Sequence, residues 1–273
     1  MFAHLMLILK ATIIGVVEGI TEFLPISSTG HMIIVGHFIN FEGDFANLFE
    51  IVIQLGAILA IVVLFRQKIF DSFKSLKPNG EGFKLWTCLM LAFIPTGVIG
   101  ILFHEKVEEY LFKPLFVAGA LLIGGIWMIF AENKYRNNNK INTLEQVGYK
   151  QALIIGCFQC LSVLLPGFSR SASTIIGGWI MGLSSVIAAE FSFFLAIPTM
   201  IIATVYSLLK TSLVLNVYEI LSLITGFVVS FIVALIVVDK FIHFLKTKPM
   251  KSFAVYRIIV GILIIVLVFT HII

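Results

Sequence analysis

Two carboxylates, three hydroxyls and an imidazole lie within fourteen residues near the start of the sequence. Glu18 and Glu22 are four residues apart and therefore share one face of a helix, where two like charges repel each other, which packing alone does not explain. Pro25 is expected to end that helix. The polar residues that follow are Ser27, Ser28, Thr29 and His31. Paired carboxylates beside hydroxyl groups are suited to holding a hard cation or to serving as a general base.

A second stretch, from Gly156 to Thr174, repeats the pattern of the first. A shift of 141 positions pairs Pro25 with Pro166 and Ser28 with Ser169, and it places Arg170 opposite Thr29. Further along the chain, a shift of 140 pairs Glu50 with Glu190. The sequence therefore predicts one domain over residues 1–273, made of two related halves at about 1–135 and 148–273. The first half carries the paired acids, and the second carries the arginine.

The composition is that of an integral membrane protein. Hydrophobic residues make up 59% of the 273 residues and charged residues only 12%, about half the charged fraction of a soluble protein. The mean hydropathy is +1.07. A net charge of +4 is too small to indicate a nucleic-acid partner. The first residues lack a basic segment and a small-residue cleavage site, so we interpret them as part of the mature chain rather than as a signal peptide.

Six apolar stretches are long enough to cross a bilayer as helices. They are expected at 48–65, 85–103, 115–131, 186–209, 217–238 and 253–273. The loops at 66–84, 132–150 and 239–252 carry five, four and four Lys or Arg residues, which places them in the cytoplasm by the positive-inside rule. The less basic connections at 104–114 and near Lys210 are then external. The chain is expected to start on the outer side of the membrane.

The number of membrane crossings between these loops then determines the topology of the remaining segments. Between the inner loop ending at Lys150 and the outer turn at Lys210 only one full span, 186–209, is available, so residues 151–183 must enter and leave on the same side. By the same argument the first 40 residues form a hairpin that enters from outside. The predicted fold is all-α, with six transmembrane helices and two re-entrant helical hairpins in an inverted repeat.

The competing topology makes residues 31–40 and 174–184 cross the membrane, but ten residues at 1.5 Å per residue span only about half of the hydrocarbon layer. In the preferred topology both breaks, at Pro25 and at Pro166, lie at hairpin tips that meet near the midplane. A new helix starts after each break, so backbone N–H groups and positive dipole ends converge there. This arrangement is suited to binding an anion.

Ionisable residues within membrane segments are costly and therefore suggest function. Those expected there are Glu18, Glu22, His31, Glu50, Arg170 and Glu190. Arg170 lies between two serines at a helix start, and its planar guanidinium matches the geometry of phosphate. Glu50 and Gln54 share a helix face and could support the site or line a substrate channel. Glu190 is interpreted as a structural partner.

These motifs resemble one known family. The segments EGITEFLPISSTGH (from Glu18), FEIVIQLG (from Phe49), PGFSRSAST (from Pro166) and YRIIVG (from Tyr256) are similar to those of the undecaprenyl-diphosphate phosphatases, also called bacitracin resistance proteins. The likeness extends over essentially the whole chain. It implies hydrolysis of undecaprenyl diphosphate to the monophosphate on the outer side of the membrane, which recycles the lipid carrier for peptidoglycan synthesis. It also implies a divalent cation, Mg²⁺ or Ca²⁺, and a homodimer.

Phosphoryl transfer depends mainly on positioning and charge neutralisation. With the resemblance, we expect the phosphates to be held by Arg170 and by five hydroxyl residues: Ser27, Thr29, Ser169, Ser171 and Thr174. Glu18 and Glu22 are expected to hold the cation, or one of them to act as general base. Ser28 is the first choice for the nucleophile, with His31 as base or leaving-group acid. A phosphohistidine at His31 or direct attack by a metal-bound water are the alternatives.

A transporter is the other class of function that this pattern allows. Inverted repeats with broken helices that meet at the midplane also form the sites of secondary transporters. A lipid-phosphate flippase would need Arg170 to bind its cargo, but it would have little use for two adjacent acids, a serine cluster and a histidine. The sequence therefore favours a hydrolase.

Overall fold

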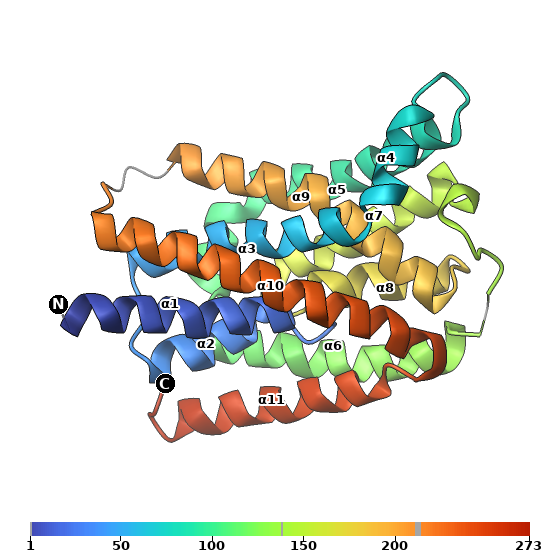
Figure 1. Cartoon of the computed structure of the whole chain (residues 1–273). Helices are drawn as coiled ribbons and strands as arrows, with labels where there is room; N and C mark the ends of the chain where they lie inside the picture. The colour runs from blue at the N-terminus through green and yellow to red at the C-terminus, as the bar shows by residue number, and fades with distance from the viewer. Residues whose placement is uncertain (1, 138, 211–213) are drawn as a thin grey trace.

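The computed structural model describes residues 2–137, 139–210 and 214–273, which fold into a bundle of α-helices (Figure 1). The first half contains α1 (Phe2–Thr21), α2 (Ser28–Phe38), α3 (Asp44–Leu64), α4 (Arg66–Lys74), α5 (Glu81–Leu111) and α6 (Pro114–Tyr135). After a short 3-10 turn at Leu144–Gln146 come α7 (Tyr149–Leu164), α8 (Arg170–Ile180), α9 (Ser185–Lys210), α10 (Val217–Thr247) and α11 (Lys251–Phe269). The predicted all-α fold is confirmed.

Seven of the described helices are long and apolar enough to cross a membrane: α1, α3, α5, α6, α9, α10 and α11. Six of them coincide with the six spans expected from hydropathy. The seventh is α1, which the sequence analysis assigned to the first hairpin. Its 20 residues are enough for a full span by length alone, but α2 follows it directly and runs back beside it (Figure 1).

Both predicted hairpins are present. The chain after α2 returns to the first half of α1, where Lys10 Nζ donates a hydrogen bond to the carbonyl of Asn40 at 2.9 Å. In the second hairpin, α8 returns to the segment that precedes α7, since the backbone N–H of Ile141 donates to the carbonyl of Gly182 at 2.9 Å. The two hairpins enter the bundle from opposite ends, and their breaks meet inside it (Figure 1).

The connections are arranged in two groups, one at each end of the bundle. The three basic connections, between α3 and α5, between α6 and α7, and between α10 and α11, lie at one end (Figure 1). The chain termini and the connection between α2 and α3 lie at the other. This grouping is the one that the positive-inside argument requires.

The two breaks share an unusual backbone conformation. Ser27 and Ser169 directly precede α2 and α8 and have φ values of 71° and 72°, the left-handed region that residues other than glycine rarely adopt. In each case the serine Oγ caps the helix, accepting the N–H of Gly30 or of Ala172. The structurally equivalent serines are therefore Ser27 and Ser169.

This equivalence corrects the alignment made from the sequence. Ser169 corresponds to Ser27 rather than to Ser28, so the shift after the breaks is 142 positions and Arg170 corresponds to Ser28. The second break is one residue longer, because Gly167 follows its proline. Gly167 has a φ of 95°, and a Cβ there would collide with the carbonyl oxygen of Val117, so this position requires glycine.

Candidate active site

The two breaks enclose a cavity of about 180 Å³ in the middle of the bundle. Both hairpins contribute to its walls, together with α3 and α9. The lining residues are Glu22, Ser27, Ser28, Thr29, Gln54, Ser162, Gly167, Ser169, Arg170 and Met200. Most of them are polar, so the cavity can hold a charged group inside an otherwise apolar molecule.

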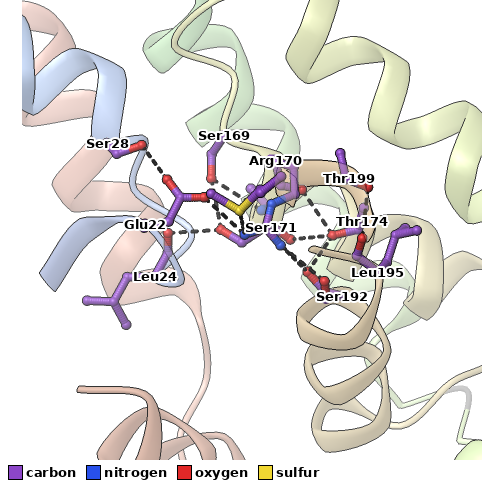
Figure 2. A network of polar contacts seen from close by, with 12 residues as sticks. Glu22, Leu24, Ser28, Ser169, Arg170, Ser171, Thr174, Ser192, Leu195 and Thr199 are labelled. Carbon is purple, nitrogen blue, oxygen red and sulfur yellow. Dashed lines mark hydrogen bonds and ion pairs between the residues drawn. The ribbon is translucent and has the colours of Figure 1, made fainter. Parts of the chain in front are cut away.

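Glu22 connects the two hairpins across this cavity (Figure 2). It lies just after α1, and its carboxylate is largely buried. Its Oε2 accepts a hydrogen bond from Ser28 Oγ at 2.7 Å, and its Oε1 is 3.0 Å from Nη2 of Arg170. One carboxylate thus contacts both a candidate nucleophile and the candidate phosphate ligand. A hydroxyl at this distance from a carboxylate has the geometry expected of a nucleophile beside a general base.

Arg170 reaches the cavity because it is the first residue of α8, directly after the capping serine. The carbonyl oxygen of Ser192 accepts from its Nη1 at 3.1 Å, and its guanidinium lies over the ring of Phe23, 5.3 Å from the centroid. Nε is buried and has no hydrogen-bond partner among the described residues. The guanidinium therefore has a fixed position, with donor capacity that the protein itself does not use.

The predicted phosphate ligands fall into two groups. Ser27, Thr29, Ser169 and Arg170 line the cavity. The other two do not: Ser171 Oγ donates to the carbonyl of Leu24 at 2.9 Å, and Thr174 Oγ1 hydrogen-bonds Ser192 Oγ at 2.7 Å (Figure 2). Their bonds join α8 to the first break and to α9. The structure thus places Ser171 and Thr174 where they position the site.

Glu18 lies one turn before Glu22 and is buried, outside the cavity lining. Its Oε1 has no hydrogen-bond partner. Within the described parts of the chain, no group of three or more His, Cys, Asp or Glu residues is placed to hold a metal ion. Mg²⁺ is commonly held by one or two carboxylates plus substrate phosphates and water. An unpartnered carboxylate oxygen one helical turn from a second carboxylate fits this donor set.

His31 faces away from the cavity. Its Nδ1 is 2.7 Å from the carbonyl oxygen of Ser27, and its Nε2 is 2.8 Å from the hydroxyl oxygen of Tyr256 on α11. The imidazole ring of His31 also stacks on the ring of Tyr256. Both ring nitrogens therefore have partners within the protein. In this geometry His31 holds the backbone of the first break in place.

Gln54 and Glu50 lie on the same face of α3 but in different cavities. Gln54 lines the central cavity, and Glu50 lines a second one of about 420 Å³ between α2, α3 and the connection after α5. Thr29 lines both. The second cavity lies at the end of the bundle that holds the chain termini, so it forms an approach to the site from that end.

Arg257 was missed by the sequence analysis, which treated 253–273 as a purely apolar span. It is completely buried in α11, and its Nη2 donates to the carbonyl of Phe168 at 2.7 Å. Weaker bonds of 3.4 Å reach the carbonyls of Gly167 and of Pro25. One side chain therefore contacts both breaks. An arginine within an apolar span was the signal for it.

Ser192 and Lys68 were also not identified from the sequence. Ser192 hydrogen-bonds both Arg170 and Thr174, and its only sequence signal is a hydroxyl between phenylalanines. Lys68 of α4 forms a 2.6 Å ion pair with Glu190, whose carboxylate is buried. Glu190 is thus paired with Lys68, and it does not line the cavity.

The chain is similar to known proteins over its whole length. It is 56% identical to the undecaprenyl-diphosphatase of Thermoanaerobacter sp. (strain X514), covering 96% of this chain and 97% of that protein. It is 51% identical to undecaprenyl-diphosphatase 2 of Clostridium acetobutylicum, with full coverage of both chains, and 50% identical to the undecaprenyl-diphosphatase of Clostridium tetani, with 96% and 97% coverage. The family model for bacitracin resistance protein BacA matches residues 11–263. The chain therefore belongs to the bacitracin resistance protein BacA family.

Proposed function

We propose that this protein hydrolyses undecaprenyl diphosphate to undecaprenyl phosphate and inorganic phosphate. The observation that carries the proposal is the position of Glu22, which bonds to Ser28 and to Arg170 across a polar cavity between the two breaks. The names of the relatives agree with this reaction. Recycling of the lipid carrier supports peptidoglycan synthesis and gives resistance to bacitracin.

The cavity residues can carry out a two-step phosphoryl transfer. Ser28 Oγ attacks the terminal phosphorus while Glu22 accepts its proton, and the anhydride P–O bond breaks to release undecaprenyl phosphate. The proton on Glu22 passes to the departing undecaprenyl phosphate, which leaves Glu22 ionised. Water then attacks the phosphoserine while Glu22 accepts a proton from it, and the P–O bond to Ser28 breaks to release inorganic phosphate and to return that proton to Ser28 Oγ. Arg170, released from Glu22 by the incoming phosphate, binds the phosphate oxygens as charge moves to the leaving group. Thr29 and Ser169 line the same cavity and can donate further hydrogen bonds.

A divalent cation, Mg²⁺ or Ca²⁺, fits beside these residues. Glu18 and Glu22 would hold it through carboxylate oxygens, with the free Oε1 of Glu18 as the first ligand. Bound there, it would neutralise charge on the phosphates.

We place the approach to the site on the outer side of the plasma membrane, with the N-terminus outside. The cavity that contains Glu50 supports this orientation, because it lies at the end opposite to the basic connections. The inverted repeat is part of the same proposal. It is supported by helix pairs that correspond between the halves, with α1 packed on α10 and α7 on α5. A homodimer also remains a prediction, which cross-linking in intact membranes would test.

The decisive experiment measures phosphate release from polyprenyl diphosphate by the purified protein in detergent, with and without EDTA. The Glu22→Gln and Arg170→Ala variants should lose release while remaining folded. The exposed residues Glu109 and Arg66 supply matched controls, Glu109→Gln and Arg66→Ala, which should keep it. Lipid binding that depends on Arg170 without any phosphate release by the wild type would overturn the hydrolase and favour a transporter.

A further inference from the structure

A second, apolar hollow lies beside the polar cavity, between α5, α7 and α9. It has a volume of about 280 Å³, and we call it the α5–α9 groove. Its lining residues are Phe93, Thr96, Gly97, Gly100, Ile101, Val163, Thr199, Ile202, Ala203, Tyr206 and Ser207. They extend from the middle of α5 and α9 toward the end of the bundle that holds the chain termini. The residues around the mouth are apolar and exposed, Ile101 by 72% and Ile202 by 42%, so the groove opens to the bilayer.

Neighbouring residues of the same two helix segments line the groove and the polar cavity. On α7, Ser162 lines the cavity and the next residue, Val163, lines the groove. On α9, Met200 lines the cavity and the preceding Thr199 lines the groove. The sulfur of Met200 is 3.8 Å from Nη2 of Arg170. A flexible, unbranched side chain thus lies at the junction of the two.

α5 and α9 form the two long walls of the groove. Each helix contains a proline at the base of the groove, Pro95 and Pro198, which removes one backbone hydrogen bond and bends the helix. Under the predicted repeat, the corresponding helices are α10 and α3. Those two pack so closely that a Cβ on Gly56 would collide with the carbonyl oxygen of Phe227. At Gly56 the two helices are therefore in direct backbone contact.

Polar contacts fix both ends of the groove. At its base, the buried Nε2 of Gln159 donates to Thr96 Oγ1 at 3.0 Å and to Thr199 Oγ1 at 3.4 Å, which joins α7 to both walls. At its outer end, Lys210 forms an ion pair of 3.3 Å with Glu105. The walls are thus held at a set separation, with the opening between them directed sideways.

We propose that the α5–α9 groove binds the first isoprene units of the polyprenyl chain while the diphosphate occupies the polar cavity. The inference rests on the proposed function. A chain attached to a phosphate at Arg170 and directed past Met200 enters the groove, and the small residues Gly97, Gly100 and Ala203 leave room for its methyl branches. Because the bilayer is as apolar as the groove, binding there selects the shape and direction of the chain rather than adding much affinity.

The test fills the groove without disturbing the polar cavity. A Cβ on Gly100 would meet no atom within 4 Å, so Gly100→Leu can be accommodated, and Ala203→Leu fills the opposite wall. The matched control is Gly119→Leu on α6, where a Cβ also meets no atom within 4 Å. The substrates are farnesyl diphosphate, which has an isoprenoid chain, and methyl diphosphate, which has none.

We expect both groove variants to lower kcat/KM for farnesyl diphosphate about tenfold or more, as added methylenes do in apolar pockets. Hydrolysis of methyl diphosphate should change less than about twofold, and Gly119→Leu should resemble the wild type with both substrates. Unchanged farnesyl hydrolysis, or an equal loss with both substrates, would overturn the proposal. If the wild type hydrolyses neither substrate, it is the proposed function that fails.

A second measurement does not depend on turnover. A farnesyl methylenediphosphonate with a diazirine on its first isoprene unit, photolysed with the wild-type protein, should label peptides from 93–101 or 199–207. Gly100→Leu should reduce this labelling, and an excess of a diacyl phospholipid should not compete with it. Labelling of other helices, or competition by the phospholipid, would contradict a groove specific for the polyprenyl chain.

Discussion

The carboxylate of Glu22 and the guanidinium of Arg170 are 3.0 Å apart, although 148 residues separate them along the chain. Glu22 follows α1, in the first hairpin, and Arg170 starts α8, in the second. The site is therefore complete only when the two hairpins pack against each other. Both side chains are largely buried, so each depends on the other to balance its charge.

Removal of either member of this pair should reduce stability as well as activity. We expect Glu22→Gln and Arg170→Met each to lower the free energy of unfolding by about 2–4 kcal/mol, because each leaves a buried charge unpaired. The double variant should lose less than the sum of the two, since no lone charge remains. Thermal unfolding in detergent measures this. Additive losses would show that the two groups do not interact.

Arg257 should act as a positioning residue, since it donates to backbone carbonyls in both breaks and does not line the cavity. Arg257→Gln should lower kcat more than KM and shift the unfolding temperature down by several degrees, because buried carbonyl oxygens lose their donors. Arg257→Lys should lower kcat and the unfolding temperature less than Arg257→Gln does, since lysine keeps a charged donor. Equal behaviour of the Lys and Gln variants would contradict this role.

Ser27 and Ser169 should tolerate glycine better than alanine. Either substitution removes the cap, but alanine also meets the steric cost of a positive φ, about 1 kcal/mol. We therefore expect Ser27→Gly and Ser169→Gly to unfold at higher temperatures than the corresponding alanine variants. The reverse order at either serine would argue against the left-handed backbone there.

The ion pair between Lys68 and Glu190 should support the fold without contributing to catalysis. Lys68→Met leaves the buried carboxylate of Glu190 without its partner, and we expect a loss of stability of about 1–2 kcal/mol, reduced because Lys68 is half exposed. Adding Glu190→Gln to Lys68→Met should recover most of the lost stability. Phosphate release by the folded variants should match the wild type, and a selective loss of activity would place this pair in the catalytic machinery.

Cation binding should be detectable without turnover. Mg²⁺ or Ca²⁺ should raise the unfolding temperature of the metal-free protein, because a ligand that binds the folded state stabilises it. Glu18→Gln should remove most of this shift, and Glu109→Gln, on the exposed part of α5, should leave it intact. A shift that survives Glu18→Gln would exclude Glu18 as a ligand.

Hydropathy and proline positions were sufficient to predict six long apolar helices and both hairpins, but not α4, which lies within the predicted loop at 66–84. Six spans followed from apolar stretches, and each break followed from a proline before a polar segment. The orientation of α8 about its own axis could not be predicted, because its first two turns carry hydroxyl side chains on several faces. Ser169 and Arg170 face the cavity, whereas Ser171 and Thr174 face neighbouring helices.

The register of the repeat was wrong by one position because the two breaks differ in length. Gly167 has no counterpart between Pro25 and Ser27, and pairwise matching of serines does not reveal which of Ser27 and Ser28 is the cap. Arg257 was missed for a different reason. A single charge hardly changes the average hydropathy of a long apolar span, so a search for spans does not reveal a charged residue within one.

The position of Arg257 in α11 also affects the order of assembly. Ribosomes make both hairpins before the last helix, yet the carbonyls of Phe168 and Pro25 bond to a side chain of that helix. Until α11 inserts, these oxygens lie in an apolar interior without this donor, and the two breaks lack the side chain that holds them together. The catalytic geometry is therefore completed by the end of translation, and a chain truncated before α11 would have every residue of the cavity but not the site.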